Sequence, residues 1–544
     1  MIALLSLFAT LLLGSSLAAP ASICGIPGVR QISGSLCSRT YNNVLVSTPL
    51  GAAEGVADSS GANRFAVRYA SAERWAKSSV ATTWALPNDA TDPAALPLVC
   101  PQQGVYDSTF SEDCLSMLLY VPKTFTASTS SPVFVWIHGG SFIEGSATDP
   151  GLDGSNLAVA TDSIVVVFQY RLGALGLLAP NGSMNLALLD VINALTFINS
   201  NIATFGGDNS RVTIAGQSSG ATMIRSLLAA PSASHLFQSA ILQSDPMNYG
   251  FLSTATYQTL QNAYNGLVGC TSSDVACQAA LSLDTILSAQ GTLSNEALGL
   301  DPSVGIGEPI RTVNDGTLIT TPLDSTAPFP SVTKPILVST VLDEATITIY
   351  GELFRSPVPE DEFEGVCDSL LGEPRTTSVV NSSFYPPPAA VNGSVDARVQ
   401  LQTLGTDYIW RCPTWTFARN WIANGGSAFV GLYTVGATYP GNEAVSLCTA
   451  PGAVCHQDDI EIVFGTVPNP NPAQANLIRE VQARYKAFML TGRPNDPAFV
   501  PWMEATSDEV NVLDLGGPGM IAVGACTPSF WGDSVPYDYQ VFDS

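Results

Sequence analysis

The stretch that decides the fold is "RVTIAGQSSGATMIRSLLAA", residues 211–230. An apolar, β-branched run (211–216) leads into a serine between two glycines, and a helix-like segment (219–230) follows. The pattern predicts a strand, a tight turn at Ser218 and a helix. Gly216 and Gly220 suit that turn because strand and helix approach closely there.

Other apolar runs extend this strand and helix into a sheet. They end at polar or glycine-rich turns and lie at 132–140, 163–171, 239–244 and 334–341. Runs without polar alternation are typical of strands buried on both faces. Since helix-like segments such as 184–202 lie between them, the sequence predicts an α/β fold with a mainly parallel sheet and helices on both faces. Segments 253–267 and 345–400 are expected to be helical insertions over the carboxyl edge of the sheet, where ligands bind.

Composition narrows the class of protein. Of 544 residues, 46% are hydrophobic and only 12% are charged, which argues against disorder. The formal net charge of -25 disfavours nucleic acid and anionic membrane surfaces as partners.

The chain begins with "MIALLSLFATLLLGSSLAAP", an apolar run followed by small residues. This form predicts a secretory signal peptide over residues 1–18, cleaved near Ala18 or Ala19. The mature chain, 19–544, is expected to be a single elaborated catalytic domain, secreted and extracellular, with no integral membrane association. Sequons at Asn181, Asn381 and Asn392 are glycosylation candidates in such a protein.

Cysteines in an exported chain indicate disulfides, and this chain has eleven. Close spacing favours four pairs and suggests a fifth, leaving Cys526 over: Cys24 with Cys37, Cys100 with Cys114, Cys270 with Cys277, Cys448 with Cys455, and Cys367 with Cys412. With only three histidines and no paired C-x-x-C, no metal site is expected.

Ser218 becomes a nucleophile only if a histidine takes its proton and a carboxylate orients that histidine. The alternative is an ordinary serine at a strand-helix turn. Among the three histidines, His235 suits a partly exposed structural position, and His138 opens a glycine-containing loop whose amides suit an oxyanion. His456 therefore remains as the base, and it follows Ser218 as the hydrolase order requires.

The acid is expected at a strand end between Ser218 and His456. "KPILVSTVLDEATI" offers Asp343 and Glu344 there, and the residues alone leave both open.

Several segments together resemble the type-B carboxylesterase/lipase family, the cholinesterase-like α/β-hydrolases, and most of all their secreted fungal members. The resembling segments are "SEDCLSMLLYVP" (111–122), "VFVWIHGGSF" (133–142), "QYRLGALGLL" (169–178), "FGGDNSRVTIAGQSSG" (205–220), "LFQSAILQS" (236–244), "DEA" (343–345) and "HQDDIEIVFG" (456–465). The resemblance implies an α/β-hydrolase fold and a serine carboxylic ester hydrolase that needs no cofactor and no metal.

The same resemblance assigns the site. It makes Ser218 the acylated nucleophile, His456 the base and Glu344, the second residue of the D-E pair, the acid. Its oxyanion hole is formed by backbone amides, which here are those of Gly140, Ser141 and Ser219.

Two departures from the family pattern affect this site. Where Ser141 stands the family commonly has glycine. Because the donor is a backbone N–H, the serine can serve if its φ is negative. Where many relatives read E-S-A, this chain reads Q-S-S, so Gln217 removes a charge and Ser219 adds a hydroxyl.

The loop between Cys100 and Cys114 bears on the substrate. It is short and holds no tryptophan, whereas cholinesterase relatives carry a tryptophan for a quaternary ammonium on a longer loop. Lipase relatives use that longer loop as a flap. The short loop thus disfavours choline esters and favours soluble esters over an interfacial lipase.

The expected partner is a small-molecule or lipid ester, with lipase, sterol esterase or aromatic-acid esterase as alternatives within the family. A non-catalytic binding protein on this fold is the alternative from another class. It is disfavoured because such proteins lose triad residues, and this chain keeps all three.

Overall fold

The computed structural model describes residues 43–58, 60–104, 109–324, 327–390 and 393–537. Residues Val44–Ser544 cluster as one compact unit. The predicted signal peptide (1–18), the predicted pairing of Cys24 with Cys37, and Asn392 lie outside the described residues.

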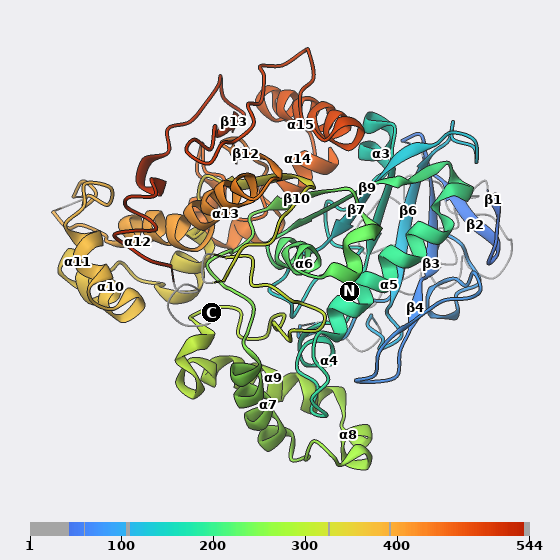
Figure 1. The fold of residues 1–544 in the computed structure, drawn as a ribbon, viewed down its shortest axis with the longest axis horizontal. Helices are drawn as coiled ribbons and strands as arrows, with labels where there is room; N and C mark the ends of the chain where they lie inside the picture. The colour runs from blue at the N-terminus through green and yellow to red at the C-terminus, as the bar shows by residue number, and fades with distance from the viewer. Residues whose placement is uncertain (1–42, 59, 105–108, 325–326, 391–392, 538–544) are drawn as a thin grey trace, which may run out of the picture. The chain divides into compact units, whose positions relative to one another are not determined.

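A large central sheet runs through this unit (Figure 1). Among the described residues its strands lie in the spatial order β1 (Asn43–Thr48), β2 (Gly51–Ala57), β3 (Ala62–Arg68), β6 (Ser116–Pro122), β8 (Ile164–Phe168), β7 (Ser131–Ile137), β9 (Gly207–Gln217), β10 (Ser239–Gln243), β11 (Pro335–Val341), β12 (Ser427–Tyr433) and β13 (Leu513–Leu515). Neighbours from β2 to β8 pair antiparallel. From β8 to β13 every pair is parallel, so the predicted mainly parallel sheet is confirmed.

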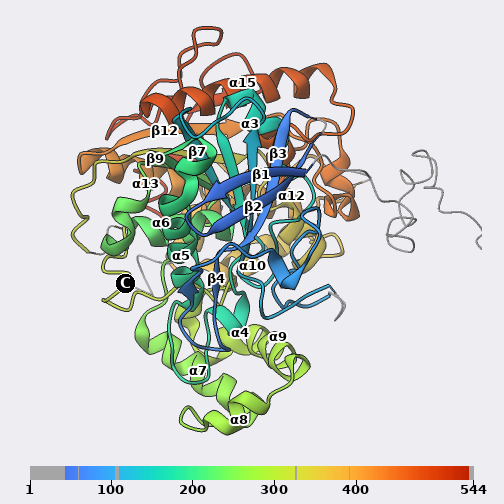
Figure 2. The same ribbon diagram turned by 90° about the vertical axis from the view of Figure 1, so that its right-hand side faces the viewer.

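Alternate residues of the central strands face two separate cores. On β7, Val133 and Val135 belong to one core, whereas Phe134 and Trp136 belong to the other. Helices α5 (Leu186–Asn201) and α6 (Ser219–Leu228) cover the first face, and α3 (Ser155–Thr161), α14 (Ile460–Phe464) and α15 (Pro472–Thr491) cover the second (Figures 1 and 2). Strands buried on both faces explain the unbroken apolar runs of the sequence.

The helical stretch Leu186–Phe205, which is α5 with the short 3-10 helix η2 (Ile202–Phe205), is long and apolar enough to cross a membrane, but most of its apolar window is buried inside the protein. It packs beside the sheet and α6, so it is a core helix of this unit.

The remaining helices follow the sheet strands as insertions. Helices α7 (Thr254–Val268), α8 (Val275–Ala280) and α9 (Leu283–Leu300) lie together at one end of the view in Figure 1. Helices α10 (Phe363–Leu371), α11 (Arg375–Val380) and α12 (Arg398–Gly405), with the π-helix η7 (Thr406–Arg411) and α13 (Cys412–Ala423), follow β11. A short helix, α4 (Gly173–Gly176), follows β8.

Disulfides join Cys100 to Cys114, Cys270 to Cys277 and Cys448 to Cys455, the neighbours that close spacing favours. The expected pairing of Cys367 with Cys412 is wrong. Cys412 at the start of α13 bonds Cys526, 114 residues away, and Cys367 is free and buried. Spacing along the chain does not reveal this pair because the fold brings the C-terminal segment back to α13.

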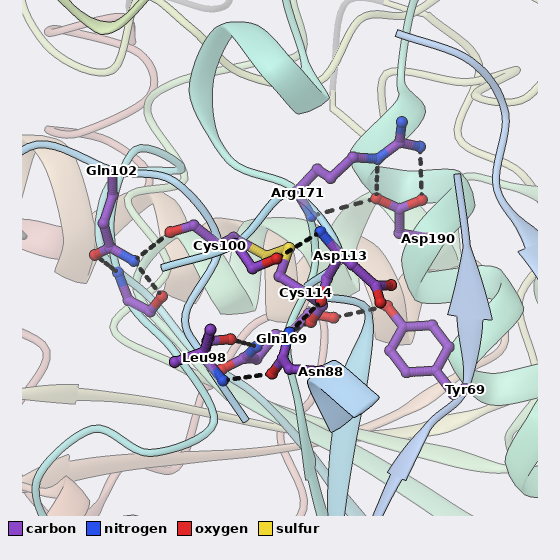
Figure 3. Close-up of a disulfide and its surroundings, with 12 residues drawn as sticks. Tyr69, Asn88, Leu98, Cys100, Gln102, Asp113, Cys114, Gln169, Arg171 and Asp190 are labelled. Carbon is purple, nitrogen blue, oxygen red and sulfur yellow. Dashed lines mark hydrogen bonds and ion pairs between the residues drawn. A yellow bond between two sulfur atoms is a disulfide. The ribbon is translucent and has the colours of Figure 1, made fainter. Parts of the chain in front are cut away.

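The Cys100–Cys114 disulfide lies in a densely hydrogen-bonded region (Figure 3). Gln102 donates to the carbonyl of Gly145 at 3.1 Å and accepts from its amide at 3.0 Å. Nearby, the buried carboxylate of Asp190 accepts hydrogen bonds from Nε and Nη2 of Arg171, both at 2.7 Å. These contacts fix the loop after β7 and the chain after β8 to their surroundings.

Candidate active site

Ser218 lies between β9 and α6 in a backbone conformation that side chains rarely adopt, with φ 57° and ψ -130°. The turn is tight because its neighbours approach closely. A Cβ on Gly216 would lie 2.7 Å from the carbonyl oxygen of Ile137, and one on Gly220 would lie 2.2 Å from the same oxygen. Glycines at both positions let the turn lift Ser218 above the sheet edge, with the positive end of α6 directly behind it.

Parallel register carries the ends of the neighbouring strands to the same edge. Gln217 of β9 stands beside Gln243 of β10, and Gln243 stands beside Ser339 of β11. Glu344 follows β11, so it also emerges at this edge.

His456 and Glu344 form a tight pair. Nδ1 of His456 lies 2.5 Å from Oε2 of Glu344, whose side chain is fully buried. The other carboxylate oxygen, Oε1, accepts from the amide of Val341 at 2.8 Å. The carboxylate therefore keeps the proton of the imidazole on Nδ1 and leaves Nε2 free to accept another.

Asp343, the alternative acid, holds a different part of the structure. Its carboxylate accepts from the amide of Val454 at 3.1 Å and from Nε2 of Gln402 at 2.9 Å. The bond from Val454 attaches the segment before His456 to the chain just after β11, and the bond from Gln402 attaches α12 to the same point. Asp343 thus positions the histidine loop, while Glu344 contacts the histidine itself.

The contact of Gln217 with the histidine could not be predicted from the sequence. Nε2 of Gln217 lies 3.1 Å from Nε2 of His456, and the side chain of Gln217 is fully buried. In the part of the chain that the structure describes, no hydrogen bond joins Ser218 Oγ to His456. Such bonds are often loose before substrate binds.

The pKa of His456 is raised above its ordinary 6.5. Burial acts to lower the pKa, but the charge and hydrogen bond of Glu344, with the charges of Asp459 and Glu308, outweigh burial. The cluster of carboxyl groups therefore makes the histidine more basic.

Two buried aspartates, Asp458 and Asp459, follow His456 closely in the chain. Asn442 donates from Nδ2 to the carbonyl of His456 and to Asp458, both at 2.8 Å. Asp459 accepts from Nε2 of Gln243 at 2.5 Å. Burial raises the pKa of Asp458 to about 7 and that of Asp459 to about 6.

The loop after β7 curls over Ser218. Gly140, Ser141 and Phe142 have successive positive φ values of 106°, 49° and 62°, so the condition of a negative φ at Ser141 is not met. The curl forces Ser141 into the left-handed region, which costs a residue with a side chain roughly 1–2 kcal/mol. A Cβ on Gly139 would lie 3.0 Å from Cβ of Ser218, which shows how closely the loop approaches.

Ser219 ties this loop to α6. Its hydroxyl accepts from the amide of Phe142 at 3.1 Å, so the extra hydroxyl of the Q-S-S turn is a bracing group. The two other histidines lie apart from this chemistry. His138 is buried and stacks on Tyr170 with ring centroids 4.5 Å apart, and burial lowers its pKa. His235 is exposed on a short helical turn.

A cavity of about 390 Å³ opens at this edge. Ser218, Glu344, His456, Gly140 and Ser141 all line it. Its other walls come largely from the segments around α10, α12 and η7, as expected for insertions over the sheet edge, with Leu370, Leu371, Leu401, Leu404, Tyr408 and Trp410 among the lining residues. By contrast, α7 and the described part of the Cys100–Cys114 loop contribute no lining residue.

The chain is similar to known proteins. Residues 42–525 match the model of the carboxylesterase family. The chain is 29% identical over 446 residues to the para-nitrobenzyl esterase of Bacillus subtilis, covering 76% of this chain and 82% of that protein. It is 30% identical over 367 residues to the crystal protein of Dictyostelium discoideum, covering 65% of this chain and 63% of that protein.

A solved structure of a PNB esterase has the same fold. The two superpose with a TM-score of 0.71 at 24% identity, over 87% of this chain and 95% of the other.

Proposed function

The chain belongs to the carboxylesterase family and is a carboxylic ester hydrolase, and from that premise we propose that it works through an acyl-enzyme on Ser218. In this proposal His456 is the base and Glu344 orients it. The observation that carries the proposal is the 2.5 Å pair of His456 and Glu344, which lines the same cavity as Ser218.

Hydrolysis takes two steps. In the first, Ser218 Oγ attacks the ester carbonyl carbon while Nε2 of His456 takes the hydroxyl proton, and His456 then gives that proton to the leaving alcohol. In the second, His456 takes a proton from water as the water attacks the acyl-enzyme, and the proton returns to Ser218 as the acid leaves. Glu344 stabilises the imidazolium formed in each step.

The oxyanion of each tetrahedral intermediate needs hydrogen-bond donors. We assign the amides of Gly140, Ser141 and Ser219 to this role, each worth about 3 kcal/mol of barrier, because the donor is a backbone N–H, which Ser141 keeps at its positive φ. Gly140 and Ser141 line the cavity, and Ser219 opens α6 beside the nucleophile.

The first experiment is hydrolysis of 4-nitrophenyl acetate, butyrate, octanoate and palmitate by the purified protein. Ser218→Ala should abolish the activity. The matched control is Ser226→Ala on the same helix, where the hydroxyl bonds the carbonyl of Thr222 and should not matter for the rate. Full activity in Ser218→Ala would overturn the proposal.

We further propose that the substrates are small soluble esters. The short Cys100–Cys114 loop and the absence of its described residues from the cavity lining support this choice. A preference for palmitate, or a steep gain of activity at an oil interface, would instead favour a lipase or sterol esterase. Activity on esters of aromatic acids alone would favour an aromatic-acid esterase.

We also propose that the protein is secreted after loss of residues 1–18. The disulfides support export, since such bonds persist in oxidising compartments. Asn181 and Asn381 are exposed, as glycan acceptors must be. A secreted mature chain that starts near residue 19 and shrinks on enzymatic deglycosylation is the expected result. Retention inside the cell would contradict it.

A further inference from the structure

One carboxyl group in the cavity has no part in the proposed mechanism. Glu308 lines the cavity together with Ser218, His456 and Ser141. Glu144 and Glu352 also line it, but both are exposed at its wall. Glu308 differs because its Oε2 atom is buried and has no hydrogen-bond partner among the described residues.

The backbone holds Glu308 in this place. The residue has a φ of 33°, in the left-handed region. Nη1 of Arg311 donates to the carbonyl of Glu308 at 3.1 Å and to that of Val304 at 2.8 Å, and Arg311 is buried. Behind it, a Cβ on Gly307 would lie 2.4 Å from the hydroxyl of Tyr249, so the segment is closely packed. A side chain on a braced, strained segment has few alternative positions.

The charges of the residues that line the cavity indicate which substrate groups it can bind. Among the described lining residues there is no lysine or arginine, and there are three carboxylates besides Glu344. Burial raises the pKa of Glu308 to about 7, although Arg311, the Ser141 hydroxyl and His456 act in the opposite direction. A buried carboxyl oxygen without a partner is costly, and a donor brought by a ligand removes that cost.

We propose that Glu308 is a specificity residue that accepts a hydrogen bond from the substrate, so that the preferred esters carry a hydroxyl or ammonium group near the ester carbonyl. This inference rests on the proposed function. A site built to bind a donor rejects the analogue that lacks it, because its own polar group is then left unpaired. Esters that carry a carboxylate are excluded by the same acidic lining.

The test compares esters in which a hydroxyl or an ammonium replaces a methyl group. The acyl series is methyl 3-methylbutanoate, methyl 3-hydroxybutanoate and methyl 3-aminobutanoate. The alcohol series is butyl, 3-hydroxypropyl and 3-ammoniopropyl acetate. Acid release gives kcat/KM at pH 8, and the ratio of each donor ester to its plain partner is measured in the wild type and in variants. Comparing these ratios between proteins cancels the intrinsic reactivity of each ester.

Glu308→Leu should lower the ratio about tenfold to hundredfold in the series whose donor reaches residue 308, as expected for a hydrogen bond to a charged group. Glu308→Gln keeps an acceptor without the charge, so it should retain most of the hydroxyl ratio and lose the ammonium ratio. This variant also protects the test if Glu308→Leu fails to fold. The matched control, Glu296→Leu on α9, removes the same charge from an exposed position that does not line the cavity, and it should leave every ratio within about twofold.

Equal ratios in the wild type, Glu308→Leu and Glu308→Gln across both series would overturn the inference while leaving the esterase intact. If the wild type hydrolyses none of these esters and no 4-nitrophenyl ester, the proposed function fails instead.

Discussion

Replacing Glu344 by glutamine should abolish nearly all activity without unfolding the protein. The carboxylate accepts two hydrogen bonds, from His456 at 2.5 Å and from the amide of Val341 at 2.8 Å. A glutamine has one acceptor oxygen and cannot serve both donors. If its oxygen stays with Val341, its NH₂ group faces Nδ1 and selects the tautomer with the proton on Nε2. That tautomer cannot take the proton of Ser218.

The expected loss in kcat is about 10⁴-fold, the size of the effect when a serine hydrolase histidine is held in the wrong tautomer. At 1.36 kcal/mol per factor of ten, this is about 5.5 kcal/mol of barrier. The assay is kcat for 4-nitrophenyl butyrate, with the thermal unfolding midpoint as a check of folding. Asp343→Asn is the matched control because its amide oxygen can still accept from Val454 or Gln402. The assignment of Glu344 fails if its variant stays within tenfold of wild type, or if the Asp343 variant loses as much.

Further measurements test the site and its support. Because the pKa of His456 is raised and the base must be neutral, activity should fall on acidification with a midpoint above 6.5, and a midpoint below 6.5 would contradict this. Gln217→Leu removes a donor that favours the neutral ring, worth about 1 kcal/mol, so that midpoint should rise by about 0.7 pH unit; a fall would refute the role. Asp190→Ala leaves the buried charge of Arg171 unpaired and should lower the free energy of unfolding by about 3–5 kcal/mol in denaturant titrations. Arg493→Ala, at an exposed ion pair, should cost under about 1 kcal/mol, and equal losses would show that burial is irrelevant.

Much of the fold could be predicted because its signals are local. The apolar runs at 132–140, 163–171 and 334–341 correspond to β7, β8 and β11. A strand buried on both faces is recognised from its own apolar residues, and the turn at Ser218 from the neighbouring Gly216 and Gly220. Neither prediction depends on residues far away in the chain.

The site was only partly accessible from the sequence. His456 follows from the scarcity of histidines, but the residues left Asp343 and Glu344 open, because both stand at the same strand end. The contact of Gln217 with His456, the place of Glu308 in the cavity and the Cys412–Cys526 bond each join residues far apart in the chain. The positive φ of Ser141 could not be read from the sequence because the curl of its loop comes from packing against the turn at Ser218.

The Cys412–Cys526 bond turns the segment between these residues into a covalent ring. The ring contains His456 but neither Ser218 nor Glu344, so the active site is assembled between a closed loop and an open chain. Closing a loop of about 100 residues is worth roughly 4–5 kcal/mol in the chain-entropy model. A host cell with a reducing cytosol would therefore make a protein in which the segment that carries His456, the proposed base, is held less firmly. Choice of an oxidising expression host belongs to the design of every experiment on this enzyme.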